Sequence, residues 1–280
     1  MSSSPGQPLR DLRSDEIEAY RRDGCMMARG LMADQWFEQI ERAVDKVMAA
    51  PTPISAVFSD PKAGFHMEAG LFITDDDIRE VVYRSPMARL AQNLMNSQKV
   101  HFFYDQMFCK TAGNQHPTPW HHDLTFWPID GDQVVSMWIP LDPVSKQSSG
   151  LEFVRGSHLW PHRYKAITPM YNEQMVDPDH EDVPDIEANR ADYDIVSFEM
   201  EPGDMLFFHP LTLHGSGPNF HLKQGRRALS FRWIGDEVIF APTPCTMPYA
   251  AKGLAPGEIV RDPAFPQVLP PLDQAVTDRV

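Results

Sequence analysis

A chain of 280 residues is long for one domain, but it fits a single barrel or sandwich with helical additions, and 42% hydrophobic residues suffice for a sizeable core. Its 25 basic and 39 acidic side chains give a net charge of −14, which argues against nucleic acid or an anionic membrane as a partner, because both require a positive surface. An anionic small molecule is not excluded, since one buried arginine can outweigh a distant surface field.

The first third of the chain is predicted to be helical. After a loose tail over residues 1–13, Ser14 is the expected N-cap of a helix with acidic residues in its first turn, and Gly24 ends that helix. Residues 14–97 are therefore expected to form a helical buttress. Its predicted elements are a helix over about 14–22, a strand over 25–28, a helix over 33–49 that stops at Pro51, and a helical stretch over 76–95 that breaks near Ser85-Pro86.

From Val100 the pattern changes to short runs rich in β-branched and aromatic residues, separated by Pro, Gly and Asn clusters. This pattern indicates an antiparallel β core over residues 98–240, a barrel or jelly roll that the N-terminal helices buttress. A polar insertion at 161–192 resembles a lid loop, and 241–280 form a Pro-rich C-terminal segment. The expected strands are 100–109, 134–141, 151–154, 195–200, 205–208 and 226–234.

The cysteines and the N-terminal sequence indicate in which cellular compartment the protein is expected. Cys25, Cys109 and Cys245 are odd in number and too far apart for a Cys-x-x-Cys site, which is typical of reduced thiols in a cytoplasmic protein. The N-terminus lacks the apolar segment of a signal peptide, and no apolar run approaches the roughly 20 residues that cross a bilayer. We therefore expect a cytoplasmic protein without a membrane partner, and the sequence does not indicate its oligomeric state.

Two remote segments carry the residue types of a metal site. In Trp120-His121-His122-Asp123, His121 and Asp123 would share one face of a strand, whereas His122 would point elsewhere. His214 comes 93 positions after His121 and must arrive from a distant strand. Two imidazoles and one carboxylate on one side of a metal are typical of non-haem Fe(II) oxygenases.

Chance is the competing explanation, because a lone His-x-Asp is common and 11 histidines always offer a third ligand. The surroundings of His214 favour the metal. It follows a Gly203-Asp204 turn and an apolar run, at a strand end where an inward polar group is costly unless it binds something.

Several separated motifs, in the right order over about Asp15 to Gly235, resemble the phytanoyl-CoA dioxygenase (PhyH) family of Fe(II)/2-oxoglutarate oxygenases. The family usually has Trp-His-Gln-Asp where this chain has His122, and often a Pro where this chain has Arg155. The motifs are residues 20–24 (Tyr-Arg-Arg-Asp-Gly), 120–123, 156–158 (Gly-Ser-His), 202–204 (Pro-Gly-Asp), 214–219 (His-Gly-Ser-Gly-Pro-Asn) and 226–230 (Arg-Arg-Ala-Leu-Ser).

This resemblance implies a double-stranded β-helix, cupin-like core, with Fe(II) and the co-substrates 2-oxoglutarate and O2. It implies His121, Asp123 and His214 as iron ligands. It implies Arg226 as the partner of the co-substrate carboxylate, with Ser216 beside it and Trp138 nearby. Related halogenases replace the carboxylate ligand by a small residue, so Asp123 argues for oxygenation.

Elementary chemistry also favours an arginine near the strand start at 226. A buried dicarboxylate must have its charge paired, and the planar guanidinium fork matches a carboxylate with two hydrogen bonds. Arg226 and Arg227 alternate along a strand, so only one of them points inward. We expect Arg226 to do so; the alternative is that both are exposed at a strand end.

Each candidate pocket residue has more than one possible role. Gln106 would need partners if buried and is a candidate contact of 2-oxoglutarate or substrate, whereas Lys110 could reach an anion or stay at the surface. His122 could bond substrate or be a core histidine, and Arg232 or Trp233 could face inward. The remaining candidates line or simply pack the pocket: Tyr104 and Phe108, which share a strand face with Gln106, and Phe126 and Trp127, which follow the ligands.

Together these observations predict a dioxygenase that hydroxylates, or otherwise oxidises, a C–H bond of a small organic molecule and releases succinate and CO2. Desaturation, epoxidation and rearrangement are compatible with the same site. Two alternatives are a metal-binding jelly roll that binds ligand without turnover, and a cupin-like isomerase or lyase that uses the metal as a Lewis acid. An absence of 2-oxoglutarate decarboxylation would favour the first, and activity without O2 the second.

Overall fold

The computed structural model describes residues 5–166, 177–244 and 253–271, so Cys245 and parts of the predicted loop and C-terminal segment lie outside it. Its helices are α1 Ser14–Asp23, α2 Asp34–Ala49, α3 Pro53–Phe58, α4 Leu71–Thr74, α5 Asp76–Arg84 and α6 Met87–Met95. Its strands are β1 Cys25–Ala28, β2 Phe65–Ala69, β3 Val100–Lys110, β4 Thr118–His121, β5 Ile129–Asp130, β6 Val134–Pro140, β7 Leu151–Val154, β8 Ile195–Ser197, β9 Met205–Phe208, β10 His214–Ser216, β11 Arg226–Ile234, β12 Ile239–Phe240 and β13 Gln267–Leu269.

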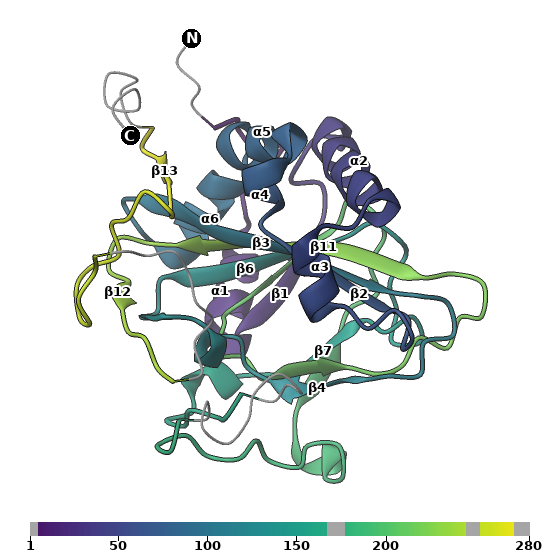
Figure 1. Ribbon diagram of the computed structural model, residues 1–280. Coiled ribbons are helices and arrows are strands. Elements are labelled where there is room, and N and C mark those ends of the chain that lie inside the picture. The colour runs from purple at the N-terminus through teal and green to yellow at the C-terminus, as the bar shows by residue number, and fades with distance from the viewer. Residues whose placement is uncertain (1–4, 167–176, 245–252, 272–280) are drawn as a thin grey trace.

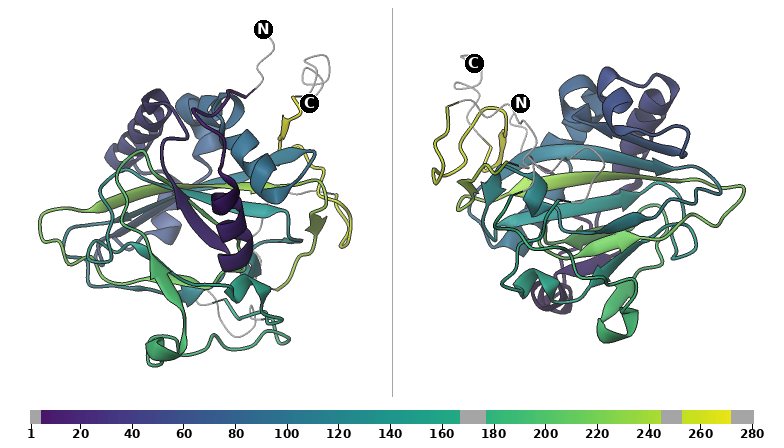
Figure 2. Two further views of the ribbon diagram at one scale, coloured as in Figure 1. Left: turned by 180° about the vertical axis from the view of Figure 1, so that it is seen from behind. Right: turned by 60° about the horizontal axis from the view of Figure 1, so that its bottom comes forward.

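Two antiparallel sheets form the body of the molecule. The larger sheet has the order β1-β9-β6-β11-β3-β13, with β2 also pairing with β3, and the smaller has the order β4-β10-β7-β8. The smaller sheet lies against one face of the larger sheet, and helices α2, α4, α5 and α6 cover the other (Figures 1 and 2). The predicted fold class, a mainly-β jelly roll buttressed by N-terminal helices, is confirmed.

The helix-covered face of the larger sheet holds the main hydrophobic core. Most outward-facing residues of the central strands are apolar and pack against the buried faces of the helices. This cluster includes Ile40, Val44, Val81 and Leu90 from the helices and Met107, Leu229, Phe231 and Trp233 from the sheet. The opposite face, called the inner face below, looks toward the smaller sheet.

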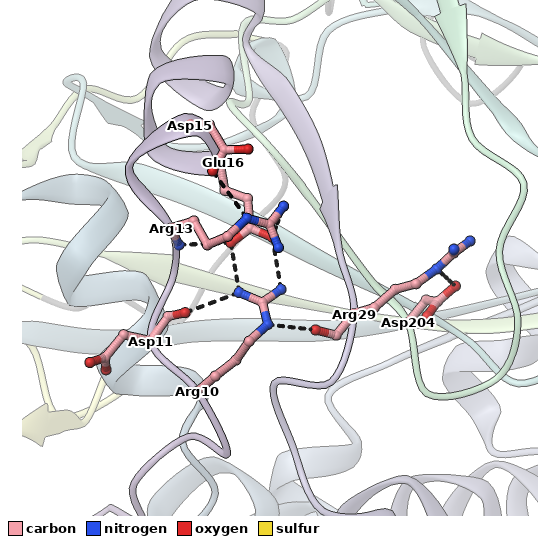
Figure 3. Close-up of polar contacts among 7 residues, drawn as sticks. All are labelled: Arg10, Asp11, Arg13, Asp15, Glu16, Arg29 and Asp204. Carbon is pink, nitrogen blue, oxygen red and sulfur yellow. Dashed lines mark hydrogen bonds and ion pairs between the residues drawn. The ribbon is translucent and has the colours of Figure 1, made fainter.

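The segment before α1 is held in place, contrary to the prediction of a loose tail for residues 5–13. Glu16 is buried and accepts hydrogen bonds from the Arg10 guanidinium at 2.7 and 2.8 Å and from the Arg13 N–H at 2.8 Å (Figure 3). Arg10 Nε also donates to the carbonyl of Arg29, just after β1. Arg13 is the N-cap rather than Ser14, because Glu16 satisfies the backbone of Arg13 from within the helix.

Helix α1 ends at Gly24, as predicted. Gly24 adopts φ 75°, a left-handed conformation that a glycine reaches without strain, and its N–H bonds to the Tyr20 carbonyl. A side chain here would also collide with His158 and Thr212.

Several elements were not predicted. The buttress segment also contributes β2 to the larger sheet, and α3 begins at Pro53, where Thr52 caps it, rather than the chain simply breaking there. The C-terminal segment adds β13 beside β3, and β12 pairs with β5. The predicted strand over 195–200 ends at Ser197. In the described parts of 161–192, only the short 3₁₀ turn η4 Arg190–Asp192 is helical.

Replacing Glu16 with Ala leaves the Arg10 guanidinium and the Arg13 N–H without their acceptor. We expect the free energy of unfolding to fall by about 1.5–3 kcal/mol, the range for hydrogen bonds to charged groups, measured by urea denaturation. Asp15→Ala is the matched control, because Asp15 is an exposed carboxylate of the same turn that pairs with exposed Arg13. Equal midpoints for the two variants would show that Glu16 does not hold this segment.

Candidate metal centre and its surroundings

The pairing of β4 with β10 brings the predicted metal ligands together. His121 lies directly opposite His214 in the register of these antiparallel strands, and their ring centroids are 4.3 Å apart. Asp123 Oδ1 lies 3.6 Å from His121 Nε2 and 3.8 Å from His214 Nε2. One ligand atom from each residue lies within 4.8 Å of the other two, which is compatible with binding to one ion.

The predicted reason for the convergence of His121 and Asp123 is wrong. Strand β4 ends at His121, and Asp123 has helical backbone angles (φ −73°, ψ −34°) at the start of the turn η1 Leu124–Phe126. Its N–H donates to the Pro210 carbonyl at 2.8 Å. A turn anchored on the segment before β10, not strand alternation, aims the Asp123 carboxylate at the histidines.

Backbone carbonyls set the tautomer of both histidines. His121 Nδ1 lies 2.8 Å from the Pro119 carbonyl, and His214 Nδ1 lies 2.9 Å from the Thr212 carbonyl. A carbonyl only accepts, so each Nδ1 carries the hydrogen and each Nε2 presents a lone pair toward Asp123. This is the arrangement in which a neutral imidazole ligates a metal.

Electrostatics keep the donor set in its metal-binding protonation state. Burial, together with the neighbouring His121, lowers the pKa of His214 to about 4. Burial alone would raise the pKa of Asp123, but the histidines and Arg232 outweigh it and hold that pKa well below its usual range. At neutral pH the centre therefore offers an ionised carboxylate and a neutral His214.

Alternation along β3 and β11 decides which side chains face the centre. On β3, Tyr104, Gln106 and Phe108 share the inner face, as predicted, and stay partly exposed, whereas Met107 and Cys109 pack under the helices. In the antiparallel pairing of β3 with β11, Gln106 lies opposite Ser230, Phe108 opposite Ala228 and Tyr104 opposite Arg232. The even-numbered residues from Tyr104 to Lys110 on β3 and from Arg226 to Arg232 on β11 thus line one continuous inner face, up to the register shift after Arg232.

Arg226 points inward and Arg227 points outward. Arg226 is buried beside Trp138, with its guanidinium carbon 5.6 Å from the indole centroid, and it donates to the Phe108 carbonyl at 3.3 Å. Its Nε has no hydrogen-bond partner among the described residues. Arg227 instead forms ion pairs with Glu41, Asp45 and Asp142.

Lys110 is buried next to Arg226 rather than exposed. It pairs with Arg226 across the two strands, and its Nζ donates to Ser216 Oγ at 3.1 Å and to the His116 carbonyl at 2.9 Å. Burial, with a smaller contribution from Arg226, lowers the pKa of Lys110 to about 7. Two cationic side chains and Ser216 therefore meet at one end of the inner face.

The aromatic candidates lie around the opposite end of the inner face. The Phe126 ring lies 6.1 Å from His121, and Trp127 Nε1 donates to the Tyr104 hydroxyl at 2.8 Å. The Phe108 ring lies 5.8 Å from the guanidinium carbon of Arg232. Gln106, between the two ends, places Nε2 2.9 Å from Met67 Sδ.

His122 has the contacts of a core histidine, which favours that alternative. Its Nε2 accepts a hydrogen bond from the Tyr164 N–H at 3.2 Å and contacts Thr125 Oγ1. Burial lowers the pKa of His122 to about 3, so it stays neutral. Tyr164 belongs to the predicted 161–192 loop, of which residues 167–176 lie outside the described structure.

The comparisons with known proteins agree with this geometry. The family model described as phytanoyl-CoA dioxygenase (PhyH) matches residues 20–228. The chain belongs to the PhyH family. A probable phytanoyl-CoA dioxygenase of Caenorhabditis elegans is 31% identical over 124 residues, which cover 43% of this chain and 37% of that protein. The match thus spans little more than a third of this relative's own length.

Solved structures share the fold of this PhyH protein. The non-heme alpha ketoglutarate dependent carbocyclase SnoK from nogalamycin biosynthesis aligns with TM-score 0.71 at 18% identity, covering 94% of this chain and 99% of that chain. The epimerase SnoN, solved in complex with Fe3+, alpha ketoglutarate and nogalamycin RO, aligns with TM-score 0.69 at 21% identity, covering 91% and 97%. Among the described residues of the present chain, no helix has the length and apolar character needed to span a bilayer.

Sequence reasoning missed part of the site of this PhyH protein. Ser149 donates to the Gly217 carbonyl at 2.6 Å and to Ser216 Oγ at 3.1 Å, and nothing in its sequence context signals this. Ser230 extends the inner face beyond Arg226, and strict alternation from Arg226 along β11 would have found it. Of the two alternatives near the end of this strand, Arg232 faces inward and Trp233 packs under the helices.

Asp123→Ala removes the charged ligand of the candidate centre. We expect the affinity for Mn(II) to fall by at least about 100-fold, because the two remaining imidazoles are poor ligands for this metal. Titration calorimetry with the purified protein measures this. Asp130→Ala removes a nearby carboxylate that pairs with Arg163 and is the control. Equal Mn(II) affinity in the two variants would rule out Asp123 as a ligand.

Proposed function

We propose that this PhyH protein is an Fe(II)- and 2-oxoglutarate-dependent dioxygenase that oxidises a C–H bond of a small organic molecule, with release of succinate and CO2. The observation that carries the proposal is the convergence of His121, Asp123 and His214 beside an inner face that also holds Arg226, a buried cation without an ion-pair partner among the described residues. An acid that chelates the metal and extends toward Arg226 would satisfy both features.

The donor set fits Fe(II). His121 Nε2, His214 Nε2 and an Asp123 oxygen would hold the ion, and the orphaned Asp123 Oδ2 and the two Nδ1–carbonyl bonds support a preformed site. Iron bound there would supply the activation of O2. The protein itself orients the ligands, and the apolar rings of Phe153 and Phe208 beside His214 exclude water from one side of the centre.

Arg226, Ser216 and Lys110 form a receptor for the far carboxylate of 2-oxoglutarate. Burying a guanidinium and an ammonium side by side costs free energy unless an anion joins them, and the described residues offer no ion-pair partner for either group. A carboxylate can accept from both cations and from the Ser216 hydroxyl, with Trp138 as the wall. The SnoN complex with alpha ketoglutarate supports this assignment by its shared fold.

The substrate would lie on the aromatic side of the centre. Tyr104, Phe108, Phe126 and Trp127 offer ring faces to an apolar body, and Gln106 offers an amide. Related halogenases have a small residue in place of this carboxylate ligand, so Asp123 favours oxygenation over halogenation. A cytoplasmic location is part of the proposal and rests on the buried, unpaired thiols of Cys25 and Cys109.

The direct test is substrate-dependent formation of succinate from 2-oxoglutarate by the Fe(II)-loaded protein, over a panel of small apolar molecules under air and under nitrogen. The proposal expects 2-oxoglutarate to bind and succinate to require O2. Metal binding without any affinity for 2-oxoglutarate would contradict it, and product formed under nitrogen would indicate Lewis-acid chemistry instead.

Arg226→Gln should weaken binding of 2-oxoglutarate to the Mn(II)-loaded protein. Loss of one partner from a buried charged pair costs roughly 2–5 kcal/mol, which corresponds to at least about 30-fold in the dissociation constant. Arg227→Gln is the matched control, because this neighbour on the same strand points outward to Asp142. Its 2-oxoglutarate affinity should not change. A stronger effect in Arg227→Gln than in Arg226→Gln would reverse the assignment.

Binding of 2-oxoglutarate should also weaken as pH rises above about 7. The pKa of Lys110 is about 7 without an anion and rises when a carboxylate binds beside it, so its attraction is complete below pH 7 and is lost above it. Lys110→Met removes this dependence. Calorimetric titrations from pH 6.5 to 9 should give a slope for the original protein that is steeper than for Lys110→Met; identical slopes would exclude Lys110 from the site.

A further inference from the structure

The proposed function assigns no role to Arg232, a buried cation on the inner face. It lies six residues after Arg226 on β11, is only 2% exposed, and faces Ser136 and Tyr104 on the neighbouring strands. Its guanidinium carbon lies 4.5 Å from the Tyr104 ring centroid and 5.6 Å from that of Trp127. These ring faces hold the guanidinium in one place, since the interaction of a cation with an aromatic face is attractive.

Asp123 is the carboxylate that compensates this charge. Among the described residues, Arg232 forms one ion pair, in which Nη2 lies 3.7 Å from Asp123 Oδ2, while Nε and Nη1 have no hydrogen-bond partner. A buried guanidinium without a counter-ion is strongly unfavourable, so the positions of Arg232 and Asp123 are coupled.

The two oxygens of Asp123 face different partners. Oδ1 is the oxygen that lies between the two histidine Nε2 atoms, and Oδ2 is the oxygen that faces Arg232 and lacks any hydrogen bond. A small rotation of the carboxylate, or a small shift of the guanidinium, would turn the 3.7 Å contact into a charge-assisted hydrogen bond.

We propose that Arg232 is a positioning residue that holds Asp123 Oδ2, so that Asp123 binds the metal through Oδ1 alone. Two histidines and one carboxylate oxygen leave the opposite side of a metal open for the co-substrate and O2. If Oδ2 also bound the metal, it would take one of those open positions. The inference rests on the proposed metal centre and adds to it a reason why a second arginine is buried there.

The experiment uses Co(II), whose visible absorption reports how many donor atoms surround it and how they are arranged. Arg232→Met keeps the length and apolar contacts of the side chain but removes the donor of Oδ2. We expect the Co(II) spectrum of this variant to differ from that of the original protein. We also expect its affinity for 2-oxoglutarate in the Co(II) form to fall, because a second oxygen of Asp123 on the metal would compete for a position that the co-substrate needs.

Ser136→Ala is the matched control. Ser136 lies directly opposite Arg232 on β6 and is fully buried. In the described structure its hydroxyl has no hydrogen-bond partner, so it forms no hydrogen bond with Asp123. Its Co(II) spectrum and 2-oxoglutarate affinity should match those of the original protein. If Arg232→Met had the same Co(II) spectrum and the same 2-oxoglutarate affinity as the unsubstituted protein, the proposal would be overturned.

A crystal structure of the original protein with Mn(II) keeps the inference testable if Arg232→Met does not fold. We expect Oδ1 on the metal and Oδ2 about 3 Å from Arg232 Nη2. Both oxygens on the metal, or a guanidinium turned away from Asp123, would overturn the role of Arg232. That outcome would leave the dioxygenase proposal standing, whereas one-oxygen binding without any succinate formation would refute the proposed function and keep the inference.

Discussion

The register between β4 and β10 is the constraint on which the centre depends. Because His121 lies directly opposite His214, one strand pair joins ligands that are 93 positions apart in the chain. A slip of β10 by one residue would turn the His214 imidazole to the other side of the sheet, away from His121. The register is protected on both flanks: β10 also pairs with β7, where Phe153 stacks on His214, and the segment before β10 accepts the N–H of Asp123 through Pro210.

The two faces of the larger sheet have different roles: the outer face forms the hydrophobic core, and the inner face carries the side chains of the site. Its outer face carries apolar residues such as Leu229 and Phe231 under the helices, and its inner face carries Arg226, Ser230 and Arg232 at alternate positions of the same strand. Buried polar and charged groups such as those on the inner face lower the stability of the fold unless they are paired. The apolar outer core compensates for this cost, which includes that of Arg226, a buried cation without an ion-pair partner among the described residues.

Much of this fold follows from the sequence, and the exceptions have physical reasons. Four strands, 25–28, 151–154, 205–208 and 226–234, have the predicted bounds because glycine or proline follows each of them within two residues. Strand β2 (Phe65–Ala69) was missed because half-buried edge strands have a weak apolar signal. Burial of Lys110 and the pairing of Arg232 with Asp123 depend on contacts between remote segments, which local pattern cannot reveal.

Overall charge and local charge act in opposite directions on an anionic co-substrate. The net charge of −14 repels a dicarboxylate at a distance, but at physiological ionic strength this field is screened within roughly 8 Å. Arg226 and Lys110 are buried and adjacent, where screening is weak and the effective dielectric constant is lower than in water. Local attraction therefore determines affinity, while the acidic surface slows only the approach. The depressed pKa of Lys110 reflects this local environment, since burial and, to a smaller extent, the neighbouring Arg226 favour the loss of its proton until an anion binds beside it.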